Sequence, residues 1–505
     1  MEDILVVKDE HPKRIVVKKG DIIIIICSVL LGVLFNILFY KKPLGISYPM
    51  FVIAFYVVFL WNLRHKITFK LSFGWLLSIP IIALSFTYFI FSNQIFADLN
   101  FLMIPILIIV QTVLITEDNK HQWFDTRFIK DIIYGLFNRT LGNTLKPFVV
   151  GFSSIRIKES SEKYDVIKKV LMGVAISIPL FIVVITLLAS ADRVFQHFID
   201  EISRSFGSIN LSDFSIQGVI VLLISMIVFS YIWSFLYSND SDQTQVQLGS
   251  INTNNRSWDP IISITILSVI NCVYLIFTMI QFGYMFDSIN NALPPDFTYA
   301  EYARRGFFEL LIVTLINFSL LLSSLSLTRK AGKLVTRTVR LLHSLLVLCT
   351  MVILTSAYLR MSLYETAYGY TYLRVLTHSF MVFLCVLFII AFYKVWNERI
   401  SLLKPYIVVS IIAYTMINFA NIDVLITRNN IERYSQTGKL DTQYLRNLSY
   451  DSIPELVNLL DDEKVSIDIK TSLVEKQEAI FKKKPWQTFN LSQYNAKRVL
   501  SQYKL

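Results

Sequence analysis

The chain has 505 residues, of which 54% are hydrophobic and only 17% are charged, and its mean hydropathy is +0.54. A soluble globular domain carries about 25% charged residues, so this composition excludes a purely soluble protein. The net charge of +11 would suggest a nucleic-acid partner in a soluble protein. In a membrane protein, an excess of Lys and Arg instead marks cytoplasmic loops and contacts with anionic headgroups. We therefore expect the lipid bilayer and its anionic headgroups as partners, and no nucleic acid.

Long apolar runs predict about 11 transmembrane helices, because a hydrocarbon core of about 30 Å requires about 20 helical residues. In chain order the runs are 22–40, 48–63, 72–92, 99–115, 168–189, 216–237, 260–286, 306–327, 341–359, 376–393 and 405–420. The first run is too long for the core of a signal peptide, and no small-residue cleavage site follows it, so we expect it to remain as a span. The predicted fold class is an all-α polytopic membrane protein with a small α-helical C-terminal domain.

The distribution of Lys and Arg predicts which loops lie in the cytoplasm. With the N-terminus inside, the inner segments carry 27 basic residues, ten of them in 116–169, and the outer loops carry 8. An odd number of spans then places the C-terminal tail outside, whereas merging or losing one span would place it inside. We expect a cytoplasmic N-terminus and an extracytoplasmic C-terminus.

The predicted spans divide the chain into five parts, which are a cytoplasmic segment at 1–21, the first four spans at 22–115, a cytoplasmic loop at 116–167, spans five to eleven at 168–420 and a helical tail at 421–505. In the loop, residues 121–139 place their apolar side chains on one helical face, which is typical of a helix lying in the headgroup region. A helix packed beneath the spans is the alternative. In the tail, Gly438, Asp441, Pro454 and Asn490 mark the ends and starts of short helices.

Sequence motifs for familiar chemistry are absent. The chain contains no G-x-x-x-x-G-K-[ST] phosphate loop, no H-E-x-x-H zinc motif and no G-x-S-x-G nucleophile motif. Cys27, Cys272, Cys349 and Cys385 lie in apolar runs without a partner at disulfide or metal spacing, so we expect each to be a buried small hydrophobe. We predict no metal and no cofactor, and the sequence leaves open whether the protein is an enzyme.

Polar residues at membrane depth are costly and invite a functional interpretation, and they gather at the predicted outer ends of spans eight to eleven. In the segment 297–309, Glu301, Arg305 and Glu309 are spaced i, i+4 and i+8 and share one helical face. Apolar residues follow Glu309 directly, so its charge requires a partner or must be neutralised. A structural Arg305–Glu309 pair is one interpretation, and a proton-carrying or ligand-facing carboxylate is the other.

A second polar group extends from Arg360 to His378. Arg360, Glu365 and Arg374 fall in one short loop, and Arg374 and His378 share a face at i and i+4. Arginine binds carboxylate and phosphate through two parallel hydrogen bonds, so an anionic headgroup or a lipid-linked phosphate suits this group. The tyrosines of the same stretch also suit an interfacial aromatic belt, which is the structural alternative. The same predicted face carries Asp192, Arg193, His197 and Asp423.

Four stretches of the chain resemble a known bacterial family. Ser190–Phe195, Phe297–Leu310, Tyr364–Arg374 and Asn421–Arg433 are similar to motifs of the membrane family called domain of unknown function forty-one seventy-three, which is related to forty-one fifty-three. The resemblance covers roughly 160–440, and its most specific part is the stretch AEYARRGFFE that ends at Glu309. It implies a multi-pass protein of the bacterial cytoplasmic (inner) membrane, and it implies no activity or catalytic residues.

The leading hypothesis is a protein that binds an anionic lipid or small ligand at an outer-leaflet site formed by Arg304, Arg305, Glu309, Arg360, Glu365, Arg374 and His378. The output would be sensing, envelope organisation or transport. One alternative is an envelope enzyme acting on a lipid-linked substrate, with Glu309 or Asp423 as general base. Another is a proton-coupled transporter with Glu309 as carrier, although no inverted repeat is evident. A structural partner protein with every charge paired is the third.

Overall fold

The computed structural model describes residues 18–154, 211–237, 258–289, 307–329, 332–397 and 399–503. In these ranges the chain is helical, and the one strand-like pairing is an isolated bridge between Trp258 and Thr328. The expectation of an all-helical chain is confirmed for this part. The chain packs as two compact units, described separately: unit 1 comprises residues 1–89, 102–240 and 484–489, and unit 2 comprises residues 90–101, 241–483 and 490–505.

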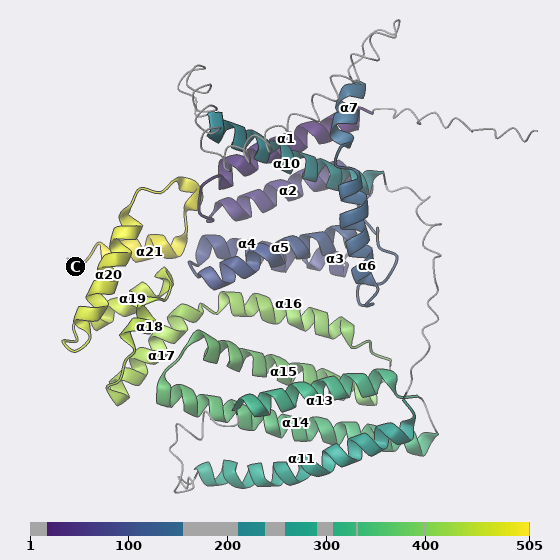
Figure 1. Cartoon of the computed structure of the whole chain (residues 1–505), viewed down its shortest axis with the longest axis vertical. Helices are drawn as coiled ribbons and strands as arrows, with labels where there is room; N and C mark the ends of the chain where they lie inside the picture. Colours follow the sequence, from purple (N-terminus) through teal and green to yellow (C-terminus); the bar gives the residue numbers. More distant parts are fainter. Residues whose placement is uncertain are drawn as a thin grey trace, which may run out of the picture. The chain divides into compact units, whose positions relative to one another are not determined.

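Eight helices of the described part are long and apolar enough to cross a membrane. They are α1 (Lys19–Phe39), α3 with α4 (Phe73–Leu76 and Ser78–Ile90), α5 (Gln94–Ile115), α10 (Leu211–Leu236), α11 (Pro260–Ile289), α13 (Phe307–Leu327), α14 (Lys333–Tyr368) and α15 (Tyr372–Trp396) (Figure 1). α16 (Leu403–Phe419) and α17 (Ile422–Thr437) meet the same criterion as a pair bent by 59°, and α2 (Ser47–Leu63) is apolar but shorter. The predicted fifth span at 168–189 lies outside the described residues. The count of about 11 spans therefore remains a prediction.

Apolar side chains on the outside of these helices explain the composition. α11 exposes Val273, Ile276 and Met279, the last with 72% of its surface accessible. Soluble proteins rarely expose contiguous apolar faces, whereas lipid tails solvate them readily. Cys272 lies in the same part of α11 and is exposed, which corrects the expectation that all four cysteines are buried; of the four, Cys349 is fully buried.

Unit 1 is built on the close packing of α1 against α10. A Cβ atom at Gly32 would lie 2.3 Å from Ser225 Oγ and 2.5 Å from the Val221 carbonyl oxygen. Small residues at helix crossings allow two backbones to approach closely inside a membrane. Large buried rings, including Phe59 and Phe229, fill the core of this unit. Gly32 is therefore a position where size, not conformation, fixes the residue.

A segment late in the chain, Trp486–Phe489, also belongs to unit 1. The backbone N–H of Ile46 donates to the Phe489 carbonyl at 2.9 Å. Gly45 lies against the same backbone, where an added Cβ would come within 2.6 Å of the Thr488 carbonyl carbon. The turn before α2 and this late segment are therefore packed as neighbours.

The loop after α5 is helical over 128–141, as α6 (Phe128–Ile133) followed directly by a π-helix (Tyr134–Leu141), and α7 (Lys146–Ser154) comes after a turn. Phe128 is buried in the core of unit 1, with Ile132 and Leu136 packed against the same core, whereas Ile129, Ile133 and Phe137 are exposed. One edge of the predicted apolar face therefore packs on the unit 1 core, and an exposed apolar stripe remains beside it. The location of this stripe in the headgroup region stays a prediction.

α14 is the central helix of unit 2 and packs against α11, α13 and α15 (Figure 1). Two amides tie these helices together inside the apolar region. Asn271 Nδ2 donates to the Leu342 carbonyl, and Asn317 Nδ2 donates to Thr350 Oγ1, each at 2.9 Å. Interhelical hydrogen bonds of this kind contribute about 1 kcal/mol in membranes. α14 has 36 residues. It is therefore about 54 Å long and extends beyond a hydrocarbon core of about 30 Å.

The predicted ends of the tail helices are confirmed. α17 stops before Gly438, which has φ +69. Asp441 caps α18 (Thr442–Arg446) by accepting from Tyr444 N at 2.9 Å, and Asn490 caps α21 (Leu491–Leu500) by accepting from Gln493 N at 3.1 Å. Pro454 lies in the first turn of α19 (Ile453–Leu456), and α20 covers Ser466–Phe481. Side-chain capping and the freedom of glycine at positive φ set these ends.

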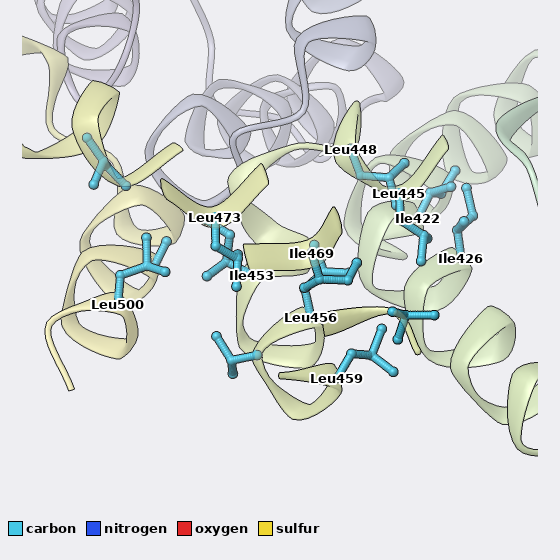
Figure 2. Packing of buried hydrophobic residues seen from close by; sticks show 14 of the residues in the cluster. Ile422, Ile426, Leu445, Leu448, Ile453, Leu456, Leu459, Ile469, Leu473 and Leu500 are labelled. Atoms are coloured by element: carbon cyan, nitrogen blue, oxygen red, sulfur yellow. The ribbon is translucent and has the colours of Figure 1, made fainter. Parts of the chain in front are cut away.

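The tail helices share one apolar core. Figure 2 labels many of its buried members, which are Ile422, Ile426, Leu445, Leu448, Ile453, Leu456, Leu459, Ile469, Leu473 and Leu500. Phe96, at the start of α5, and Val375, at the start of α15, belong to the same core. The tail helices therefore share one hydrophobic core with the starts of α5 and α15.

Leu473→Ala tests this core. Leu473 is completely buried, so we expect the substitution to destabilise the tail by about 2–5 kcal/mol through lost burial and a residual cavity. Ile467→Ala is the control, because Ile467 lies on the same helix with 77% of its surface exposed. The measurement is the rate of limited proteolysis of the tail in detergent. Equal rates for the two variants would contradict the core.

Candidate functional site

Three of the predicted site residues, Glu365, Arg374 and His378, lie where α14 turns into α15. Gly369 ends α14, and its N–H donates to the Glu365 carbonyl at 2.7 Å. Its φ is +86, which L side chains rarely adopt, and an added Cβ would lie 2.6 Å from Asn430 Oδ1. Glycine is therefore required both by conformation and by space. This turn places Glu365 of α14 opposite His378 of α15.

Glu365 and His378 form an ion pair in which the carboxylate is buried. His378 Nδ1 lies 3.0 Å from Glu365 Oε2. His378 Nε2 lies 3.2 Å from the Tyr358 carbonyl oxygen. A carboxylate and a carbonyl both accept, so this arrangement suits an imidazolium with two N–H donors. Glu365 Oε1 is buried and has no hydrogen-bond partner among the described residues.

Arg374 is held on the other side of the same turn. Its Nη1 donates to the Gly369 carbonyl, and its guanidinium lies 4.2 Å from the centroid of the Tyr364 ring. Tyr364 in turn packs against Tyr368, with ring centroids 4.9 Å apart. A cation over an aromatic face gains about 0.5–2 kcal/mol and keeps the guanidinium edge oriented. Arg374 and His378 lie one turn apart on α15, as the spacing predicts, and they have different partners: Arg374 contacts Tyr364, whereas His378 contacts Glu365.

α17 holds the turn through hydrogen bonds to its backbone, which act as a clamp. Arg433 Nε donates to the Thr366 carbonyl at 2.8 Å, and its Nη2 donates to the Ala367 carbonyl at 2.7 Å. Asn430 accepts from Tyr370 N and donates to the Tyr370 carbonyl, each at 2.9 Å. The last carbonyls of a helix lack intrahelical donors, and the Arg433 guanidinium donates the missing hydrogen bonds at the end of α14. The turn between α14 and α15 therefore moves only if α17 moves with it.

Of the other predicted site residues, the structure describes Glu309 and Arg360. Leu310 packs with Ala357 and Met361, so α13 begins beside the same end of α14. Glu309, in the first turn of α13, is exposed. Arg360 is half-buried on α14, five positions before Glu365. The remaining predicted residues, which are Arg304, Arg305, Glu301, Asp192, Arg193 and His197, lie outside the described part of the chain.

Asp423, at the start of α17, lies in a second polar cluster that is closed. It is 1% exposed and accepts from Tyr372 Oη, from Asn93 Nδ2 at 2.7 Å and from Ser449 Oγ at 2.8 Å. A buried carboxylate requires such donors, because an unpaired charge away from water is very costly. With three donors on it, Asp423 anchors the tail to α5 and α15. The prediction that it acts as a general base has no support in this geometry.

Asp451 is a second buried carboxylate surrounded by donors, and it shares the Ser449 hydroxyl with Asp423. Its Oδ2 accepts from Ser92 N and Ser92 Oγ, each at 2.8 Å, and from Ser449 Oγ at 2.9 Å. Ser92 Oγ also lies 3.0 Å from Ser492 Oγ. Ser92 and Asn93, which bond to Asp451 and Asp423, lie more than three hundred positions earlier in the chain, so no local pattern marks these clusters.

Lys476 of α20 borders this network. Its Nζ donates to the Leu448 carbonyl at 2.8 Å. Burial lowers the pKa of the Lys476 ammonium from 10.5 to about 8, and the Asp423 carboxylate opposes this shift. Between about pH 8 and 10.5 the unfolded chain therefore binds more protons at this residue than the folded chain. Stability rises with pH across this window, because the cost of burying the charge disappears as the folded state loses its proton.

Lys476→Met tests the buried ammonium. Between pH 7.5 and 10, we expect the melting temperature of the variant to rise less, or fall more, than that of the unmodified protein, because the variant lacks the pH-dependent term. Lys470→Met is the matched control, since Lys470 is an exposed lysine of the same helix. Differential scanning fluorimetry across this pH range makes the comparison. A Lys476→Met curve parallel to that of the unmodified protein would refute the interpretation.

These observations define the class of the protein. Apolar helices of membrane-crossing length, with apolar faces outward, make it an integral membrane protein, and its described residues contain no group of three or more His, Cys, Asp or Glu placed to hold a metal ion. Residues 78–459 match the family described as "Domain of unknown function (DUF4153)", and the chain belongs to this family. No curated protein and no solved structure matches the chain.

The family match refines the resemblance seen in the sequence. The family shown is forty-one fifty-three, which the resemblance gave as the relative of forty-one seventy-three. The match begins at residue 78, so it includes most of the third predicted span and all of the fourth, which lie outside the resembling stretches. The family brings no activity, so the chemistry of the site must be argued from its own residues.

Proposed function

We propose that this protein binds an anionic group, from a lipid headgroup or a small solute, at the turn between α14 and α15, and that it signals occupancy to its C-terminal helices. The site uses Arg360, Glu365, Arg374 and His378, with Glu309 at its edge. Arg304 and Arg305, predicted from the sequence, extend it on the α13 side. The protein sits in the bacterial cytoplasmic membrane with this turn at the outer leaflet.

The observation that carries the proposal is the buried carboxylate of Glu365, one of whose oxygens has no partner among the described residues. A buried acceptor left without a donor costs about 1–3 kcal/mol. Glu365 Oε2 is bonded to His378, while Oε1 has no partner among the described residues. A ligand that offers a hydroxyl or ammonium donor to Oε1 and an anionic group to Arg374 would relieve this cost. Phospholipid headgroups with a hydroxyl or an amine beside the phosphate have this combination.

The route to the C-terminal helices is the clamp on the turn. Arg433 and Asn430 of α17 hold residues on both sides of Gly369. Any shift of Glu365 or Arg374 on ligand binding displaces carbonyls that α17 is bonded to. This coupling favours sensing over a passive lipid contact.

The other hypotheses have less support. An envelope enzyme would need a general base, and the Asp423 carboxylate is occupied by three donors. A proton-coupled transporter would need a buried carboxylate, and Glu309 is exposed. Glu365 is a buried carboxylate at this end of the spans, so a transport mechanism would use the Glu365–His378 pair instead of Glu309.

Arg374→Ala and Arg360→Ala test the binding site. Charge-assisted hydrogen bonds contribute about 1.5–3 kcal/mol each, so either change should reduce retention of phosphatidylglycerol about tenfold or more. Native mass spectrometry of the full chain, delipidated and then supplied with this lipid, measures retention. Arg374→Lys keeps the charge but loses the planar fork, and we expect an intermediate result.

Arg428→Ala is the matched control for these variants. Arg428 is an exposed arginine of α17 paired with Glu455 at 2.7 Å, away from the turn. It should leave retention unchanged. Equal retention by all the variants, with unchanged melting temperatures, would end the proposal.

Reporter fusions test the orientation. Alkaline phosphatase fused after the last residue should be active in a bacterial host, because the enzyme needs disulfides that form outside the cytoplasm. The same reporter inserted beside Lys120, in the loop with the most basic residues, should be inactive. The opposite pattern at either position would reverse the predicted side.

A further inference from the structure

A basic cavity lies at the opposite end of α14 from the ion pair. Its volume is about 250 Å³. It is lined by the start of α11, the end of α13, the start of α14 and the end of α15, through residues that include Pro260, Ser324, Arg329, Arg340, His343 and Lys394. Arg340 and Glu365 are separated by 25 positions of one helix, so the two sites lie about 38 Å apart along α14.

The lining has one sign of charge. Arg329, Arg340 and Lys394 contribute cations from three helices, and no acidic residue is among the described residues that line the cavity. All three cations take part in interactions within the chain, so a ligand would meet charges that are already held in position. Clustered Lys and Arg between transmembrane helices at the membrane surface favour phosphate-bearing headgroups.

The helix ends around the cavity are tied to one another. Trp258 N donates to the Leu327 carbonyl at 2.8 Å, and Arg329 N donates to the Trp258 carbonyl at 3.2 Å. These two bonds join the exit of α13 to the entry of α11. Ser263 Oγ lies 2.8 Å from Thr328 Oγ1 and strengthens the same junction. A site on rigid helix ends loses little entropy when it binds a ligand.

Side-chain hydrogen bonds fix the other walls. His343, 2% exposed, has Nε2 at 2.8 Å from Ser324 Oγ. Trp396 Nε1 donates to Ser344 Oγ at 3.2 Å, which ties the end of α15 to α14. Val335 and Thr336 line the cavity from the first turn of α14, whose N-cap, Gly332, makes no side-chain cap. The uncapped backbone N–H groups of this turn add partial positive charge at the cavity.

We propose that this cavity is a second anion site, which binds a phosphate group from an anionic phospholipid or from the free ion. Its volume is below the 300–1,000 Å³ or so of pockets for larger organic ligands, so it suits a headgroup and not a whole metabolite. The length of α14 carries Arg340 out of the hydrocarbon region, to the level where headgroups lie. In the predicted orientation this is the cytoplasmic leaflet.

Arg340→Gln combined with Lys394→Gln tests the site in the full chain. The Arg374→Ala background is used, so that the proposed outer site does not contribute. The readout is thermal stabilisation by dihexanoyl phosphatidylglycerol against dihexanoyl phosphatidylcholine, and by inorganic phosphate against chloride at constant ionic strength. We expect the double change to weaken the effective probe about thirty-fold, because each cation near the surface is worth about 1 kcal/mol of attraction to an anionic lipid.

Arg337→Gln is the matched control. Arg337 is exposed one turn before Arg340 on the same helix and does not line the cavity, so its loss should change nothing. Stabilisation by phosphatidylglycerol alone identifies a lipid site, and stabilisation by phosphate as well identifies a site for the phosphate group itself. No stabilisation by either probe, or equal loss in the control, overturns the proposal. If the double variant does not fold, Arg329→Gln is read by the same criteria.

Discussion

The constraint on which the described part of unit 2 depends is the length of α14. A helix of 36 residues cannot be contained in a hydrocarbon core, so several turns at each end must be solvated by headgroups, by neighbouring helices or by ligands. At its start, α14 carries Arg340 and His343 into a basic cavity. At its end, it carries Glu365 and the backbone carbonyls to which Arg433 donates hydrogen bonds. The apolar middle packs on three helices, and the chemistry is confined to the two ends.

Buried charge is the second organising feature. Asp423 and Asp451 are both buried, and each is surrounded by hydroxyl, amide or backbone donors. Such a network adds little net stability, but removing one partner strands a charge away from water. The network therefore determines the position of the tail on the ends of α5 and α15, and it contributes little to the stability of that contact. Glu365 differs, because one of its oxygens lacks a donor among the described residues.

What the sequence could predict was local. Apolar runs gave the spans, and Asp441, Asn490 and Gly438 gave helix ends, because caps and turns depend on a few adjacent residues. The site was predicted only in part. Glu365 and His378 lie in the expected stretch, but their pairing depends on the turn at Gly369 that folds α15 back on α14.

Long-range partners could not be read from a pattern. Asn93 and Ser449 reach Asp423 from positions far apart in the chain, and Arg433 acts on carbonyls more than sixty residues earlier. The loop at 121–139 shows a related limit, because a helical period does not say which part of an apolar face meets a core. No spacing in the sequence shows that Arg329 and Lys394 line one cavity, because four helix ends bring them together.

The packing of Phe489 against the turn at Gly45 has a consequence for biosynthesis. The N–H of Ile46 donates to the carbonyl of a residue that is synthesised more than four hundred positions later. At roughly 5–20 residues per second, the ribosome needs on the order of tens of seconds to cover that distance. The first helices must therefore enter the bilayer and wait with this backbone donor unmatched. Unit 1 is begun first but is completed only by residues close to the end of the sequence, so a nascent chain that stalls before residue 489 leaves its earliest turn incomplete.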